Sequence, residues 1–133
     1  MAGPLSVYDI AGRAMAAQMV RLNTTASNLA NAGSVSGSKE TAFRSLKPVF
    51  ETVRDGDAAT VRVKQVVNSQ VEPTKRHAPD HPLADANGDV WEAGVDSAAE
   101  LVEMIETARQ YQNVVQVLQT AKTLTLDTIR MGK

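Results

Sequence analysis

The chain has 133 residues, of which 43% are hydrophobic, and this size suits one domain or one domain with a small insert. Its net charge is −1 and only 4% of its residues are aromatic, which disfavours a nucleic-acid partner. Cysteine is absent, so disulfides and thiol catalysis are excluded, and no apolar run approaches the roughly 18 residues of a membrane-spanning helix.

The amino-terminal segment has the periodicity of a helix. Apolar residues recur at steps of three and four from Leu5 to Leu29, which predicts a helix from residue 5 to about residue 30. Ser6 with Asp9 three residues later predicts its start, and the Asn31-Ala-Gly33 sequence predicts its end. The pattern leaves open whether the helix belongs to a coiled coil or to the core of a globular bundle.

Two charged residues bear on the location of the protein. Asp9 and Arg13 interrupt the amino-terminal apolar stretch, so we expect no ordinary cleaved signal peptide. Considered alone, these residues favour a cytosolic protein.

The period of the pattern changes after a turn-rich boundary at residues 33–39. Residues 49–53 and 60–67 are predicted to form two strands, and Asp55-Gly56 between them is typical of a hairpin turn. Because an isolated two-stranded ribbon is weak, we expect it to lie on the helices or on another chain.

The next segment is rich in proline. Residues 72–82 contain three prolines and are predicted to form an extended linker rather than a helix. Asn87-Gly88 predicts a further tight turn before the last helix.

The last third of the chain, Ser97 to Met131, is predicted to be one long amphipathic helix. Ser97 and Glu100 form a possible capping box at its start, and Gly132 is a natural stop. Residues 110–121 carry no charge but several amides, which indicates contact on more than one face, although an ordinary polar face would also fit. Its predicted apolar seam consists of Leu101, Met104, Ala108, Tyr111, Val115 and Leu118.

Together these elements predict a mainly α fold. The two terminal helices are expected to pair as an antiparallel coiled coil, with a small irregular insert that contains a β-hairpin. The corresponding domain division assigns residues 1–33 and 97–133 to a discontinuous helical domain and residues 34–96 to the insert.

The residues suited to metal binding form only one cluster, around His77 and His81. Pro79 and Pro82 prevent the helix that would place both rings on one face, so no metal site is expected. The chain also lacks the glycine-rich phosphate-binding and nucleophile-elbow motifs. We therefore expect neither an enzyme nor a cofactor or small-molecule substrate.

Several short segments of the chain resemble bacterial flagellar basal-body rod proteins. The resemblance runs in order over nearly the whole length, and His81-Pro-Leu-Ala-Asp85 with the short chain narrows it to the proximal rod. It departs from the family pattern after the Asn87-Gly88 turn and at Gln112-Asn-Val114. The segments that carry it are residues 8–12, 21–23, 26–32, 81–88, 103–105 and 109–112.

The resemblance implies a structural subunit of the proximal rod, packed in a helical array around the export channel and transmitting torque from the motor ring to the distal rod and hook. Its partners would be copies of itself, other rod proteins, and adaptor proteins of the motor ring or export gate. It would be exported without a cleaved signal peptide and assemble in the periplasmic space, which replaces the cytosolic interpretation.

Under this interpretation the sites are packing residues of helices and subunits, and none is catalytic. A soluble helical adaptor or regulator is the alternative hypothesis, and a metal enzyme using His77 and His81 is the third. The predicted packing residues are Tyr8, Met15, Leu22, Asn28, Leu29, Asn31, Leu101, Met104, Tyr111, Val115 and Leu118.

Overall fold

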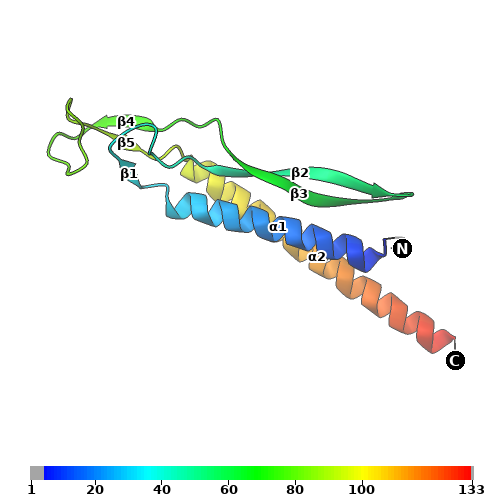
Figure 1. Cartoon of the computed structure of the whole chain (residues 1–133). Helices are drawn as coiled ribbons and strands as arrows, with labels where there is room; N and C mark the ends of the chain where they lie inside the picture. Colours follow the sequence, from blue (N-terminus) through cyan, green and yellow to red (C-terminus); the bar gives the residue numbers. More distant parts are fainter. Residues whose placement is uncertain (1–4, 133) are drawn as a thin grey trace.

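A computed structural model describes residues 5–132 of the chain (Figure 1). Two long helices enclose the strands in the sequence, and they run antiparallel beside each other in space. The described elements are α1 (Val7–Ala30), β1 (Val35–Ser36), β2 (Leu46–Asp55), β3 (Ala58–Asn68), β4 (Thr74–His77), β5 (Asp89–Glu92) and α2 (Ser97–Met131).

The prediction of a mainly α fold built on a coiled coil was wrong. The strands form a two-stranded sheet, β2-β3, and a three-stranded sheet in the order β1-β5-β4, both antiparallel, so the fold is mixed α/β. The residues that the helices bury are mostly small or polar, such as Ala17, Thr24 and Thr107, whereas Leu101 of the predicted seam is 52% exposed. Apolar residues do recur at steps of three and four. Their large side chains, however, do not interlock between the two helices, and this interlocking is what defines a coiled coil.

The local signals at the helix ends were mostly read correctly. The Ser6 hydroxyl accepts from the Asp9 amide while the Asp9 carboxylate accepts from the Ser6 amide, so the predicted capping box of α1 is confirmed. For α2 the predicted cap was wrong by one residue, because the Asp96 carboxylate accepts from the Ala99 amide at 3.2 Å and Ser97 is already helical. Gly132 ends α2, as predicted.

The predicted hairpin is confirmed and is longer than its apolar pattern indicated. Strand β2 has 10 residues and β3 has 11, and Gly56 in the turn has φ of 61°, a conformation that favours glycine. A register shift between Val49 and Phe50 marks a β-bulge. Charged residues interrupt the apolar pattern of both strands, so the sequence predicted shorter strands than the structure contains.

The proline-rich segment is extended, as predicted, but it is not only a linker. Its Thr74–His77 portion forms β4 and pairs with β5, and β5 also pairs with β1 inside the predicted turn-rich boundary. Strand pairing is possible here because Pro73, Pro79 and Pro82 all lie outside β4 and leave its amide groups free to donate. Gly88 has φ of 78°, which confirms the predicted turn before β5.

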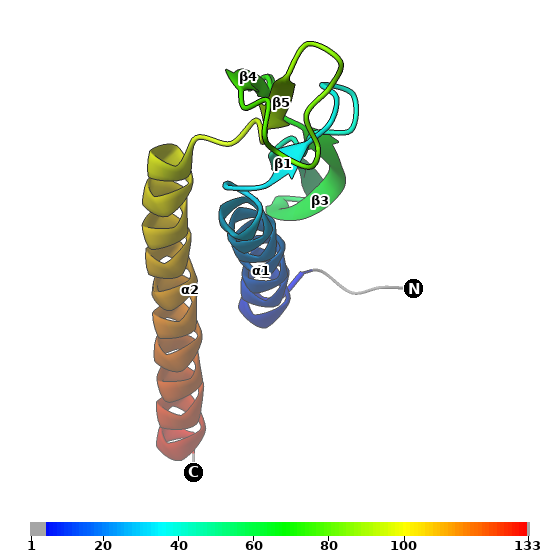
Figure 2. The ribbon, with the colours of Figure 1, turned by 90° about the vertical axis from the view of Figure 1, so that its left-hand side faces the viewer.

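The elements are arranged in layers along α1. The hairpin β2-β3 lies on one side of α1 and α2 lies on the opposite side, as the two views agree (Figures 1 and 2). The three-stranded sheet lies at the end of the helix pair that is farther from the two chain termini (Figure 1). Neither described helix combines the length and apolarity needed to cross a bilayer.

The apolar core of this arrangement is thin. Its largest fully buried apolar side chain among the described residues is Val90, and the other buried apolar residues are alanines. Folding of one chain therefore removes few large apolar side chains from water, although the chain contains many of them. The large side chains of the helices lie half-buried or exposed along their flanks.

Candidate assembly site

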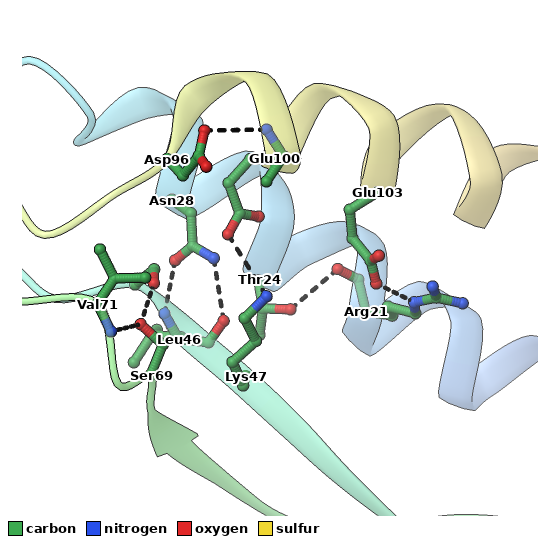
Figure 3. Close-up of polar contacts among 12 residues, drawn as sticks. Arg21, Thr24, Asn28, Leu46, Lys47, Ser69, Val71, Asp96, Glu100 and Glu103 are labelled. Atoms are coloured by element: carbon green, nitrogen blue, oxygen red, sulfur yellow. Dashed lines mark hydrogen bonds and ion pairs between the residues drawn. The ribbon is translucent and has the colours of Figure 1, made fainter.

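A group of polar contacts lies where the hairpin meets the two helices (Figure 3). Asn28, near the end of α1, is 1% exposed. Its side-chain Nδ2 donates to the Leu46 carbonyl at 3.0 Å, and its Oδ1 accepts from the Leu46 amide at 2.7 Å. The amide side chain thus pairs with the first residue of β2 as a neighbouring strand would, and attaches the base of the hairpin to α1.

The other helix holds the next residue of the same strand. Glu100, in the first turn of α2, is 3% exposed, and the Lys47 Nζ lies 3.9 Å from its carboxylate. A carboxylate buried to this degree needs a compensating charge or hydrogen bonds. Because Leu46 and Lys47 are adjacent, Asn28 and Glu100 fix the base of the hairpin from both helices (Figure 3).

A third contact couples the helices directly. The Arg21 Nε donates to the Glu103 carboxylate, and its guanidinium lies 3.9 Å from Glu106. The hydrogen bond from Arg21 lowers the pKa of the Glu103 carboxyl, and the same bond raises the pKa of the Arg21 guanidinium. Both side chains are mostly shielded from solvent, at 18% and 31% exposure, so this pair contributes more than an exposed surface pair would.

At the opposite end of the pair the helices are held by a lighter contact. The Tyr8 hydroxyl and the Thr125 hydroxyl lie 3.1 Å apart near the start of α1. Beyond Thr125, the remaining residues of α2 up to Met131 are exposed. This end of α2 therefore has little contact within the chain.

Large apolar side chains are exposed along the outer sides of the helices. Val102 and Ile105 are 64% and 61% exposed on α2, and Leu124 is 62% exposed. An open groove of about 550 Å³ between the start of α1 and α2 is lined by apolar side chains that include Val7 and Val117. Exposed apolar patches of this kind are typical of sites that bind another protein, a membrane or a ligand.

Comparison with known proteins decides the family. Residues 9–37 match the family described as flagella basal body rod protein, and residues 86–131 match the one described as flagellar basal body rod FlgEFG protein C-terminal. The flagellar basal-body rod protein FlgC of Salmonella typhimurium is 42% identical over 131 residues, covering 97% of this chain and 98% of the relative. FlgC of Yersinia enterocolitica is 40% identical with the same coverage of both chains. The chain belongs to the FlgC family of flagellar basal-body rod proteins.

This assignment confirms the resemblance that was read from the sequence. The two matched segments of the FlgC chain contain α1 and α2 almost entirely, and the first also contains Asn28. The hairpin β2-β3 lies between the two matched segments. The residues that join the hairpin to the helices therefore come from both inside and outside those segments.

The predicted packing residues occupy three kinds of environment in this FlgC chain. Asn28 is buried at the junction, whereas Tyr8 is 43% exposed and Leu101 is 52% exposed. Their role between subunits stays a prediction. The half-buried members are Met15, Leu22, Leu29, Asn31, Met104, Tyr111, Val115 and Leu118.

Apart from Asn28, the polar residues that join the hairpin and the two helices were not predicted from the sequence. Glu100 was assigned to a capping box at the start of α2, and Lys47 was not considered at all. A signal was available for the Arg21–Glu103 pair, since both residues lie within segments that carry the family resemblance and an antiparallel alignment brings opposite charges together. Lys47 carried no comparable signal, because its contact depends on where the hairpin crosses the helices.

The histidine cluster has ordinary polar contacts. The His77 Nδ1 lies 3.0 Å from an Asp89 carboxylate oxygen, and the His81 Nδ1 accepts from the Leu83 amide at 3.0 Å. Within residues 5–132, no group of three or more suitable side chains is placed to hold a metal ion. The hypothesis of a metal enzyme has no support from these contacts.

Proposed function

We propose that this chain is a structural subunit of the proximal rod of the bacterial flagellar basal body. It packs in a helical array around the export channel and transmits torque from the motor ring to the distal rod and hook. The single observation that carries the proposal is membership of the FlgC family over 97% of the chain. The alternative of a soluble helical adaptor is not favoured by any contact of the chain.

The physical character of the surface supports an assembled state. A helix that presents apolar side chains on faces not covered by its own chain needs neighbours to exclude water from them. Heterologous contacts present different faces of the same helix to different neighbours and generate open helical arrays when the rotation does not close. Many such contacts around a shaft share the load when torque is applied.

The proposal includes location and partners. The subunit lies in the basal body on the periplasmic side of the inner membrane, after export without a cleaved signal peptide. It contacts copies of itself, other rod proteins, and adaptor proteins of the motor ring or export gate. In this view residues 1–33 and 97–133 form the packing domain of the shaft and residues 34–96 form an insert, with the first four residues and the last lying outside the described structure.

Complementation in a flagellated host tests the proposal. The gene for the chain is deleted, and motility and basal-body composition are measured with and without a plasmid-borne copy. We expect the deletion strain to be non-motile, and the restored chain to co-purify with basal bodies. Full motility after deletion, or a chain that stays in the soluble cytoplasmic fraction of motile cells, would contradict the proposal.

A further inference from the structure

The hairpin β2-β3 has polar attachments to the helices only at its base. There the Asn28 side chain pairs with Leu46, and the Lys47 Nζ lies 3.9 Å from the Glu100 carboxylate. Between the described residues 48–67 and either helix, no hydrogen bond or ion pair is formed. The polar side-chain contact of this stretch, Arg62 with Glu51, lies within the hairpin itself.

A bend point follows directly on these attachments. The β-bulge between Val49 and Phe50 lies only two residues beyond Lys47 on β2. A bulge interrupts the hydrogen-bond ladder and allows the strands to bend locally. We call residues 50–63, which lie beyond the bulge, the distal hairpin. The distal hairpin can therefore move as one unit about a fixed base.

The distal hairpin lies along α1 with a small apolar contact (Figure 1). Thr60 is only 6% exposed, so its side of the ribbon is the one toward the helix. Val53 pairs with Thr60 and Asp55 pairs with Ala58, and because side chains alternate, these two pairs share one side. Val53 and Ala58 are only half-buried, and Asp55 is exposed. Little apolar area is thus available to hold the distal hairpin on α1.

The same contact contains a buried polar group without a partner. Among the described residues, the Thr60 Oγ1 is the one buried side-chain polar atom that forms no hydrogen bond. A hydroxyl in this position has given up its hydrogen bonds to water and gained none in return, which destabilises the closed contact. Movement of the distal hairpin away from α1 would return the hydroxyl to water.

We propose that the distal hairpin is a hinged arm that swings off α1 at the bulge, while Asn28 and Glu100 keep its base in place. Closed and open chains then coexist in solution, and any protein that binds the open form shifts the population toward it. The open form uncovers the side of α1 beneath the arm. This inference goes beyond the proposed function, because it concerns the isolated chain and does not depend on assembly.

Distances between two spin labels, measured by pulsed electron paramagnetic resonance, test the arm. The chain contains no cysteine, so labels can be placed by substitution alone. One chain carries Asp57→Cys at the hairpin tip and Arg13→Cys on α1, and a second carries Asn68→Cys at the hairpin base and Asn23→Cys on α1. All four positions are exposed. We expect two distances for the tip pair and a single distance for the base pair.

Thr60→Val in the tip-labelled chain tests the cause of opening. Valine keeps the shape of the side chain and removes the unpartnered hydroxyl, so the ratio of open to closed chains should fall by about tenfold. Thr52→Val is the matched control, because Thr52 is exposed and pairs with Val61 on the other side of the same ribbon. This control should leave the ratio unchanged.

Three results would overturn the inference. A single distance for the tip pair would show that the distal hairpin stays on α1, and two distances for the base pair would show that the whole hairpin detaches. An unchanged ratio in Thr60→Val would show that the hydroxyl is already satisfied, for instance by a bound water. None of these results bears on the proposed function, which the complementation experiment decides separately.

Discussion

The two ends of α2 differ in how completely the chain surrounds them. In its first three turns Glu100 and Thr107 are at most 3% exposed, and the helix is joined to α1 and to the hairpin. From Lys122 to Met131 every described residue is exposed, although the stretch includes Leu124, Leu126, Ile129 and Met131. One end of α2 is therefore packed against the rest of the chain, whereas no other element of the chain covers the other end.

The largest expected effect is on amide hydrogen exchange of the isolated chain. Amides of residues 122–131 should exchange at least about 100-fold faster than those of residues 100–107, because exposed helix ends open with little free-energy cost. Mass spectrometry of exchanged peptides measures this difference. Equal protection of both ends would show that residues 122–131 form a stable helix without neighbouring subunits, and that the two ends of α2 do not differ in stability.

The same measurement on isolated basal bodies sharpens the comparison. There the amides of residues 122–131 should become protected, because neighbouring subunits would cover this end of α2. Fast exchange in the assembled state would show that this end stays uncovered.

The next largest effect is expected from Asn28→Ala at the junction. The substitution leaves the Leu46 amide and carbonyl without their partners in a part-buried position, which should lower the free energy of unfolding by about 2–3 kcal/mol. Urea unfolding followed by circular dichroism measures the change. The matched control is Asn23→Ala on the exposed side of α1, which should change the stability by less than about 0.5 kcal/mol.

Arg21→Ala should destabilise the helix pair by a smaller amount. It leaves the Glu103 carboxylate partly shielded without its charged donor, at a cost of about 1–2 kcal/mol. A double-mutant cycle with Glu103→Ala isolates the pair from losses of packing. An interaction energy near zero in that cycle would show that the pair adds nothing to the helix contact.

The same pair gives stability a defined dependence on pH. Because the pKa of Glu103 is lowered in the folded chain, its contribution is fully present above the ordinary glutamate pKa of 4.5 and is lost as pH falls through the lowered value. Urea unfolding at several pH values below about 5 measures this loss. In Arg21→Ala the corresponding part of the pH dependence should disappear, and its persistence would point to other carboxylates.

The smallest effect on stability is expected at the exposed end of α2. Leu124→Ser should change the free energy of unfolding of the isolated chain by less than about 0.5 kcal/mol, because its side chain is 62% exposed. Swimming in soft agar should nevertheless be reduced if neighbouring subunits cover this position. A variant with normal stability and normal motility would show that Leu124 has no role in assembly.

The structural features that were predicted correctly from the sequence depend on interactions between residues close together in the chain. The capping box at Ser6 and Asp9, the turn at Gly56 and the stop at Gly132 depend on residues within a few positions of one another, and all were predicted. The cap of α2 was placed one residue late, because Asp96 and Ser97 are both suitable caps and only the backbone entering the helix selects between them.

The coiled coil failed for a different reason. A three-four rhythm specifies that a helix has an apolar side, but it does not specify what that side faces. Here small residues such as Ala17 and Thr107 bring the helices together, while Leu101 lies outside the contact. The exposure of a side chain depends on the position of other elements, which periodicity does not contain.

The sequence by itself therefore determined the two helices, the hairpin and, through its resemblance, the family. Local hydrogen bonds and residue periodicity depend only on residues that are close together in the chain. Only the tertiary structure decided that α1 lies between the hairpin and α2, that Asn28 and Glu100 join the three, and which apolar side chains remain uncovered. These features depend on contacts between residues far apart in the chain, such as Asn28 with Leu46 and Lys47 with Glu100, and no short-range pattern encodes them.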